Sequence, residues 1–321
     1  MSLIENFYTK LGVASQEEFH ERFMPERYYD QLYHYTSPSG LSSILFNNPK
    51  NMVLWASRYD VQNDASEGEI ALELYKKVCE EVCEEIEAHI RKSVGFDNIS
   101  PTRTIPMQPK INGQYKKTRP ECESYICCFS KCSDSLPMWN YYSKGNNYEG
   151  YNIGLNVDSF NHSLKTCYED LEVSTSIYPV IYDEKEQEDL IRKFIQEILH
   201  EYDSKYNDAI RYVVSNQLMM WKLLFKNKCF EHEKEVRAII NVAKTTTTRP
   251  SPVNIKYRSN GIYLIPYIEM ELDKNCLKTL TFGPQLWNEE QCQHQIKIVK
   301  DMLKVNHYSA DVEISTIPVR Y

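Results

Sequence analysis

Segments with the period-two pattern of β-strands alternate irregularly with helical segments along this 321-residue chain. Strands are expected at residues 31–36, 52–57, 124–130, 149–157, 171–182, 235–242, 262–272, 277–282 and 312–317. The longer helices are expected at residues 67–91, 184–204, 206–227 and 288–304. Because this order contains no regular βαβ repeat, it favours an α+β fold, with a mainly antiparallel mixed sheet flanked by helices.

A single domain accounts for most of this pattern. We expect an N-terminal helical arm at residues 1–30 and one α+β domain at residues 31–321, with a helical insertion at about 184–228. Residues 96–122 contain prolines and lysines without periodicity, which predicts a loop long enough to cover a site. The content of 42% hydrophobic and 26% charged residues is typical of a globular chain.

The charge and the cysteines limit the partners that we expect. A net charge of −8 gives no overall attraction to nucleic acid. A local basic strip in the long loop remains an alternative to an ordinary solvated loop; it comprises Lys110, Lys116, Lys117 and Arg119. No stretch is long and apolar enough to predict a membrane span, so we expect no membrane partner.

The cellular location is predicted from the N-terminus and the thiols. The N-terminus has no basic segment followed by a long apolar run, so we expect no secretory signal. Ten cysteines in such a chain indicate reduced thiols in the cytoplasm. Their spacing contains no paired metal-ligand motifs, so we expect buried structural cysteines and no metal.

Three separated segments carry polar side chains suited to one site. The first is QLYHYT, in which strand alternation places His34 and Thr36 on one face and Tyr35 on the other. His34 lies near the end of the strand, before a Pro-Gly turn, where side chains commonly reach a cleft. The simpler interpretation is a histidine that packs in a polar core and bonds a backbone carbonyl.

The second segment is EHEKEVRAIINV. Its apolar face alternates from Val236 to Val242, so Glu233, Glu235 and Arg237 share the opposite face. Two carboxylates beside an arginine favour a shifted carboxylate pKa, as in many functional sites. The alternative is a surface ion pair on an edge strand, which contributes little.

The third segment surrounds Trp139. A short helix places Trp139 and Tyr142 at neighbouring positions before a glycine-containing strand, either at the lip of a pocket or in the core. The loop after the second strand adds Arg58, Asn63 and Asp64, which either bind an anion or cap the following helix.

Several common catalytic motifs are absent. The sequence contains no GxxxxGK[ST] loop, no GxGxxG after a strand, no GxSxG elbow and no HExxH. This disfavours P-loop nucleotide hydrolases, Rossmann dehydrogenases, α/β-hydrolases and zincins.

Four motifs in order resemble a prokaryotic family of unknown function, DUF2971. They are LYHYTSPSGLSSIL, LWASRYDVQNDASEGE, CCFSKCSDSLPMWNYYSKGNNYEGYNIGL and FEHEKEVRAII, between about residues 31 and 242. The family usually has a proline after ND, which is absent from NDASEGE. Either Glu67 or Glu69 therefore matches the acid of that motif. The family itself implies no defined biochemical role.

A more distant resemblance, carried by HYT followed by GL and IL, is to ADP-ribosyltransferase-like domains. It implies NAD as the substrate, His34 orienting its ribose, and Glu235, with Glu233 upstream, holding a ribose hydroxyl. A preorganised carboxylate there would stabilise the positive charge that develops on the ribose. The aromatic that stacks on nicotinamide is left open among Tyr35, Trp139, Tyr141 and Tyr142.

Different classes of function follow from these segments. The first hypothesis is an NAD-using ADP-ribosyltransferase or NAD glycohydrolase, in a toxin or phage-defence setting. The second is a non-enzymatic module that binds a nucleotide or peptide in the same pocket and reports it to a partner. The third is action on nucleic acid through the basic strip. The first hypothesis requires His34 and Glu235 to surround one cavity.

Overall fold

The computed structural model describes residues 2–27, 29–61, 68–85, 88–104, 110–111, 114–115, 119–143, 149–169, 172–246, 250–284 and 289–318. The chain divides into two compact units. The helical unit comprises Met1–Glu26, Gln62–Glu123 and Tyr178–Glu231, and the sheet unit comprises Arg27–Val61, Ser124–Ile177 and His232–Tyr321. The first unit therefore joins three separate segments of sequence.

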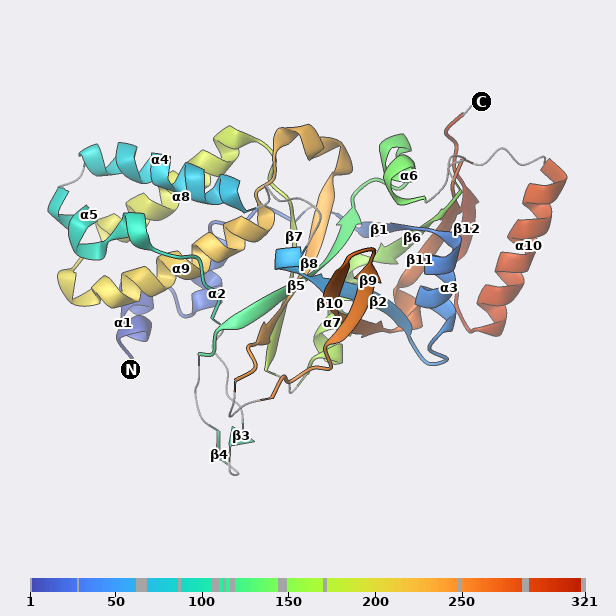
Figure 1. Cartoon of the computed structure of the whole chain (residues 1–321), viewed down its shortest axis with the longest axis horizontal. Helices are drawn as coiled ribbons and strands as arrows, with labels where there is room; N and C mark the ends of the chain where they lie inside the picture. The colour runs from blue at the N-terminus through green and yellow to red at the C-terminus, as the bar shows by residue number, and fades with distance from the viewer. Residues whose placement is uncertain are drawn as a thin grey trace. The chain divides into compact units, whose positions relative to one another are not determined.

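The helical unit is built mainly from six helices in the described ranges: α1 (Leu3–Lys10), α2 (Gln16–Glu21), α4 (Glu69–Glu85), α5 (Ala88–Val94), α8 (Glu184–His200) and α9 (Asn207–Leu224). Two short strands, β3 (Lys110–Ile111) and β4 (Gln114–Tyr115), pair with each other. Helix α4 packs against α8 and α9 (Figure 1). Phe194 and Trp221 are fully buried in its apolar core. The expected N-terminal arm and the expected insertion both contribute helices to this unit.

Ten strands form the sheet of the second unit: β1 (Gln31–Thr36), β2 (Met52–Arg58), β5 (Cys122–Ser130), β6 (Tyr151–Asn156), β7 (Val173–Pro179), β8 (Glu235–Ala243), β9 (Lys256–Asn260), β10 (Tyr263–Leu272), β11 (Leu277–Phe282) and β12 (Asp311–Ile314). Their order is β12-β11-β6-β1-β5-β2-β10-β9, with β8 paired to β5 and β7. The β11–β12 pair is parallel, whereas β6, β1, β5, β2, β10 and β9 pair antiparallel. This open, mostly antiparallel sheet flanked by helices confirms the predicted α+β class.

Four described helices belong to the sheet unit: α3 (Pro38–Phe46), α6 (Leu136–Tyr142), α7 (Val157–Cys167) and α10 (Glu289–Val305). Apolar residues from the strands and from α3, α7 and α10 form one core, which includes Leu32, Leu45, Phe160 and Val299. Helix α7 was not expected from sequence. It begins at the N-cap Asn156, directly after β6, and buries only Phe160, Ser163 and Leu164, so its apolar stripe is short.

In none of the described ranges does a helix have both the length and the apolar character that crossing a membrane requires.

Candidate functional site

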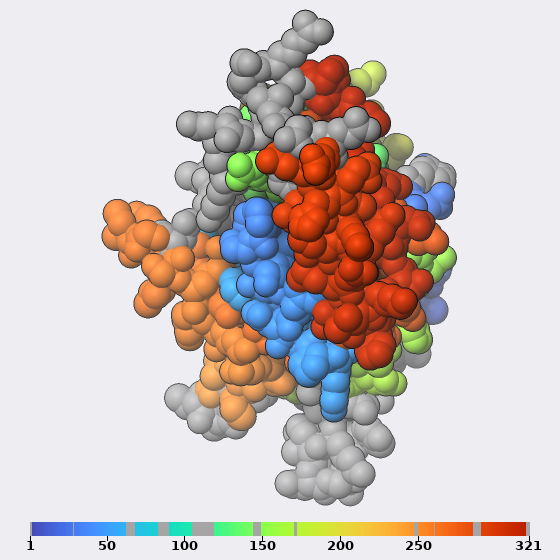
Figure 2. All heavy atoms as spheres, turned by 90° about the vertical axis from the view of Figure 1, so that its right-hand side faces the viewer, coloured from blue at the N-terminus to red at the C-terminus, as the bar shows by residue number. Residues whose placement is uncertain are grey.

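A pocket of about 440 Å³ is lined by residues of β1, α3, β2 and β9. Strands β1 and β2 both flank β5, but their pairing with it is short: Tyr33 pairs with Ser130, and Ser57 and Arg58 pair with Ile126 and Tyr125. Helix α3 follows β1 and lines the opening beside both strands. In Figure 2, α3 lies at the surface between the β9–β10 hairpin and α10. We call this hollow the His34 pocket.

His34 lines the pocket as a neutral imidazole. Its Nδ1 lies 3.1 Å from the carbonyl oxygen of Cys128, and its ring packs edge-on against Phe129. Burial lowers the pKa of His34, and the hydrogen bond to Cys128 opposes this shift. Because a carbonyl oxygen only accepts, Nδ1 carries the proton and Nε2 is left as an acceptor. The simpler interpretation from sequence, a bond to a backbone carbonyl, is therefore confirmed, and the histidine also reaches a pocket.

Hydroxyl groups and the first turn of α3 form one side of the His34 pocket. Ser37 caps the helix, since its Oγ accepts from the Gly40 amide at 3.1 Å. The hydroxyls that line this side belong to Thr36, Ser37, Ser39 and Ser43. Gly40 is required by close packing, because a Cβ there would lie 2.1 Å from Thr36 Oγ1. The helix dipole places partial positive charge at this end of α3, so this side suits a negative ligand.

The opposite side of the pocket supplies a cation and an aromatic ring. Arg258 on β9 donates from Nη2 to Ser57 Oγ at 3.2 Å, while its buried Nε has no hydrogen-bond partner among the described residues. Trp55 is 44% exposed and packs on Tyr267 with ring centroids 4.5 Å apart. No carboxylate is found among the described residues that line this hollow. Its electrostatics therefore favour an anion with an attached planar group.

Glu235 lies on the other face of β5 from His34. The Phe129 ring that touches His34 belongs, with Val236, to the hydrophobic core of the sheet unit. Strand alternation turns Cys128 and Glu235 away from that core, and the Cys128 thiol hydrogen-bonds the Glu235 carboxylate. Burial and the Glu235 charge raise the pKa of Cys128 well above its usual range, which keeps the thiol protonated.

Glu235 and Arg237 form an internal ion pair. Arg237 donates from Nε to Glu235 Oε1 at 2.8 Å and from Nη2 to Oε2 at 3.1 Å, and the two residues are 1% and 5% exposed. Strand β8 pairs on both sides, so the alternative of a surface pair on an edge strand is wrong. Glu233 contributes its backbone carbonyl, which accepts from Ser130 Oγ at 2.7 Å.

Trp139 is a core residue. It packs edge-on against Tyr35 at 4.7 Å, and its Nε1 donates to Asp134 Oδ1 at 2.7 Å. Tyr35 donates to the carbonyl of Cys132 at 2.8 Å. Both aromatic rings are buried and their polar atoms are bonded, so neither offers a face for stacking. Tyr141 and Tyr142 are exposed on α6, outside the residues that line the His34 pocket.

The remaining predicted site residues do not join the His34 pocket. Asn63 and Asp64 lie outside the described residues. Arg58 donates from Nε to Asp60 Oδ1 at 2.6 Å, on β2 beyond the lining residues. Within the predicted basic strip, Arg119 donates to Gln16 and Tyr212 in the helical unit instead of facing solvent as a phosphate contact. The other side chains of that strip are not described: Lys110, Lys116 and Lys117.

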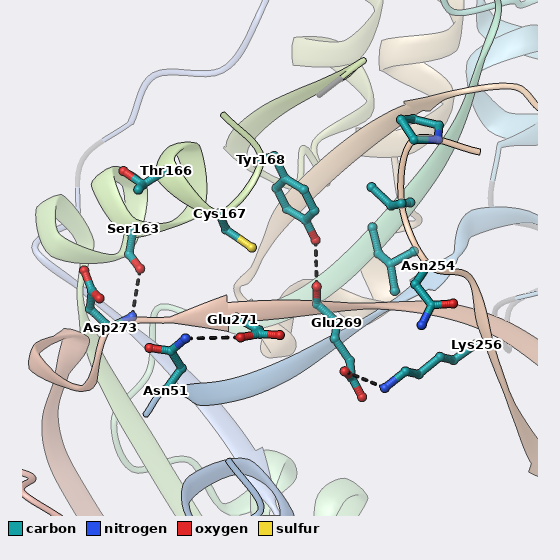
Figure 3. A pocket seen from close by; sticks show the side chains of 13 residues that line it. Asn51, Ser163, Thr166, Cys167, Tyr168, Asn254, Lys256, Glu269, Glu271 and Asp273 are labelled. Atoms are coloured by element: carbon teal, nitrogen blue, oxygen red, sulfur yellow. Dashed lines mark hydrogen bonds and ion pairs between the residues drawn. The ribbon is translucent and has the colours of Figure 1, made fainter. Parts of the chain in front are cut away.

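A second, larger cavity of about 660 Å³ lies between α7 and β10 (Figure 3). Its lining includes the carboxylates of Glu269, Glu271 and Asp273. Lys256 donates to Glu269 at 2.7 Å, and Asn51 donates to Glu271 at 3.1 Å. Three acids oppose an anionic ligand, and the polar groups already bond one another. The His34 pocket is therefore the better candidate site.

Over the ranges that the structure covers, no group of three or more His, Cys, Asp or Glu side chains is arranged to hold a metal ion.

The fold and pocket define an α+β protein with an open, mostly antiparallel sheet and a hydroxyl-rich pocket beside its first strand. Residues 138–238 match the model of the family described as "Protein of unknown function (DUF2971)". This match, over about a third of the chain, supports the resemblance to that family drawn from the sequence motifs. The matched segment includes Trp139, Glu235 and Arg237 but not His34. The chain matches no curated protein and no solved structure. The resemblance to ADP-ribosyltransferase-like domains stays a prediction.

Among the residues that line the His34 pocket, sequence reasoning predicted only His34 and Thr36. Trp55, Ser57 and Arg258 were not among the predicted site residues, although they line it. Strand β9, which carries Arg258, was not expected, because residues 256–260 are too few and too polar to show a clear alternation. Nothing in the local sequence signals that this arginine faces α3.

Proposed function

We propose that the sheet unit binds a nucleotide in the His34 pocket and holds it through its phosphate groups. One observation supports this most directly. Arg258 has a buried guanidinium nitrogen that finds no acceptor among the described residues, and it lines a pocket that also contains the first turn of α3. A buried donor without an acceptor costs about 1–3 kcal/mol, and a phosphate oxygen would remove that cost.

The groups at the start of α3 are the best match for the phosphate groups of the nucleotide. The hydroxyls of Ser39 and Ser43 and the Arg258 guanidinium are groups that donate to phosphate oxygens, and the dipole of α3 favours negative charge at this end. Gly40 supports the same interpretation, since it keeps Thr36 close to this turn. Peptide ligands are less well matched, because the polar groups are mainly donors suited to an anion.

Trp55 and His34 are the best match for the base and ribose of the nucleotide. Trp55 offers an exposed indole face beside the pocket, and aromatic faces stack on bases. His34 Nε2 is an acceptor that suits a ribose hydroxyl or a base amino group. A volume of about 440 Å³ falls in the usual range for small-molecule pockets.

NAD is a nucleotide, so we expect it to bind in the His34 pocket. We do not expect Glu235 to cleave it. Glu235 lies on the other face of β5 and is held by Arg237 in a bidentate pair. A carboxylate so placed does not reach a ribose beside His34. The geometry therefore favours binding without bond cleavage over ADP-ribosyl transfer.

The test measures ligand binding to the full chain by calorimetry and thermal shift. We expect ADP and NAD to bind, adenosine to bind more weakly, and Arg258→Gln to raise the ADP Kd at least about tenfold. Lys256→Gln is the matched control, because Lys256 lies two residues away on β9 and pairs with Glu269 outside the pocket. Nicotinamide is quantified in the NAD samples. Equal ADP affinity in the wild type and Arg258→Gln would refute the proposal.

A further inference from the structure

A cluster of buried and half-buried polar side chains lies inside the helical unit, on α1, α2 and α9 and on the segments around Arg103 and Arg119. We call it the polar centre and define it by Tyr8, Gln16, His20, Arg103, Thr104, Arg119, Tyr212, Asn216 and Gln217. All of these residues belong to the helical unit. The site proposed above lies in the sheet unit, so the two sites share no residue.

One half of the polar centre satisfies its own hydrogen bonds. Arg119 Nη1 donates to Gln16 Oε1 at 3.0 Å and to the Tyr212 hydroxyl at 3.1 Å. Tyr212 in turn donates to Gln16 Oε1 at 2.8 Å. The Thr104 amide donates to Asn216 Oδ1 at 2.8 Å, which fixes the backbone next to Arg103 along α9. These bonds give the centre a rigid frame.

The other half has polar atoms that are buried but not bonded. Tyr8 and His20 are 2% and 4% exposed. The Tyr8 hydroxyl, His20 Nε2, and Nε and Nη1 of Arg103 each lack a hydrogen-bond partner within the described part of the chain. Burial raises the pKa of Tyr8, which keeps its hydroxyl protonated and able to donate. The unbonded atoms thus comprise donors on Arg103 and Tyr8.

His20 supplies the complementary acceptor. Its Nδ1 lies 2.5 Å from Gln217 Oε1, and an amide oxygen only accepts, so Nδ1 carries the proton. Nε2 therefore presents a lone pair. Burial, together with the nearby charge of Arg103, lowers the pKa of His20 to about 3, so the ring is neutral at neutral pH. The Thr104 amide bonds Asn216 and the His20 ring bonds Gln217, so Arg103 and His20 flank adjacent residues of α9.

Few ligands match such a set of groups. A negative ligand with several acceptor oxygens fits the donors of Arg103 and Tyr8, whereas the lone pair of His20 repels a fully deprotonated anion. An oxyanion that keeps one hydroxyl satisfies all of them. Phosphate near neutral pH has this chemistry, and sulfate, which carries no proton, lacks it. The near-complete burial of Tyr8 and His20 favours a small free ion over a large phosphorylated molecule.

We infer that the polar centre binds hydrogen phosphate, with Arg103 and Tyr8 donating to its oxygens and its hydroxyl donating to His20. The bound ion accepts from the two buried Arg103 nitrogens that have no acceptor among the described residues, and it ties α1 and α2 to the segment that carries Arg103. Phosphate therefore stabilises the helical unit.

The test compares potassium phosphate with potassium sulfate at equal ionic strength, measuring the thermal midpoint and the binding isotherm of the full chain. We expect phosphate to raise the midpoint in a saturable manner and to bind at least about tenfold more tightly than sulfate, since sulfate leaves a buried acceptor unpaired. Equal responses to both ions, an adventitious electrostatic effect only, would overturn the inference.

Three variants locate the response. Arg103→Gln should raise the phosphate Kd at least about tenfold. Lys256→Gln, which lies in the sheet unit outside both proposed sites, should leave this midpoint shift unchanged. Tyr8→Phe removes one hydroxyl and keeps the ring, so it avoids a folding defect. It should weaken phosphate binding several-fold without lowering the phosphate-free midpoint. If Tyr8→Phe and Arg103→Gln keep the wild-type phosphate affinity, the polar centre holds only water and the inference fails.

Discussion

His34 and Glu235 contact the same residue from opposite faces of β5. The carbonyl oxygen of Cys128 lies 3.1 Å from His34 Nδ1, while the thiol of Cys128 hydrogen-bonds the Glu235 carboxylate. The imidazole therefore lines the pocket beside α3, whereas the carboxylate belongs to an internal ion pair. This relationship separates two residues that a transferase mechanism would require in one cavity.

Glu235→Gln should destabilise the sheet unit. The substitution leaves Arg237 charged, buried and without its carboxylate, which costs about 3–5 kcal/mol. A catalytic role predicts the opposite, a variant of normal stability that no longer releases nicotinamide from NAD. Urea unfolding of the wild type and the variant distinguishes the two roles.

The double variant Glu235→Gln, Arg237→Met is the control for that loss. Replacing both charged partners removes the unpaired charge, so we expect most of the stability to return. If Glu235→Gln keeps the wild-type urea midpoint, the ion pair does not stabilise the fold.

Gly40→Ala should disturb both α3 and the His34 pocket. The new Cβ would lie 2.1 Å from Thr36 Oγ1, so Thr36 or the helix must move, at a cost of about 1–3 kcal/mol. Thr36→Ala removes the clashing oxygen, and the double variant should recover much of the stability. Urea midpoints of the four proteins form the thermodynamic cycle, and additive losses would contradict this packing.

Acid should destabilise the helical unit through His20. Its pKa falls from 6.5 in the unfolded chain to about 3 in the fold, so only the unfolded state takes up a proton as the pH drops below 6.5. The stability present above pH 6.5 is therefore lost progressively towards pH 3. Between about pH 7.5 and about pH 5 the loss amounts to about 2 kcal/mol from this residue.

The His20→Asn variant isolates that contribution in phosphate-free buffer. Asparagine keeps a donor for Gln217 and does not titrate, so the pH dependence of the urea midpoint should become shallower. His34, whose pKa burial also lowers, contributes with the same sign and remains in both proteins. An unchanged slope would mean that His20 titrates normally in the fold.

Trp139→Phe should lower stability without changing nucleotide affinity. The variant loses the 2.7 Å hydrogen bond to Asp134 and part of the packing against Tyr35, at a cost of about 1–3 kcal/mol. Trp55→Leu should show the reverse, with weaker ADP binding and little loss of stability, because Trp55 is exposed. Calorimetry measures the ADP affinity and urea unfolding measures the stability. If Trp139 stacked on the nucleotide, Trp139→Phe would weaken ADP binding and Trp55→Leu would not.

Much of the fold was predictable because its long strands and helices repeat their apolar residues at a fixed period. The predicted strand at 31–36 coincides with β1, and the predicted helices near 184 and 206 correspond to α8 and α9. Helix α7 and strand β9 escaped prediction because each is short and largely polar. Strand alternation also put Glu235 and Arg237 on one face correctly, but it gave no sign that this face is buried.

The sequence by itself determined the α+β class, the mainly antiparallel sheet and the resemblance to the family, since these depend on local periodicity and on motif order. Tertiary structure alone decided which polar residues meet. Arg258 joins the first turn of α3, Glu235 pairs with Arg237 away from His34, and Arg119 bonds Gln16 and Tyr212 in the helical unit. The physical reason is that strand order and register set distances between residues far apart in sequence, and neither is encoded in a local pattern.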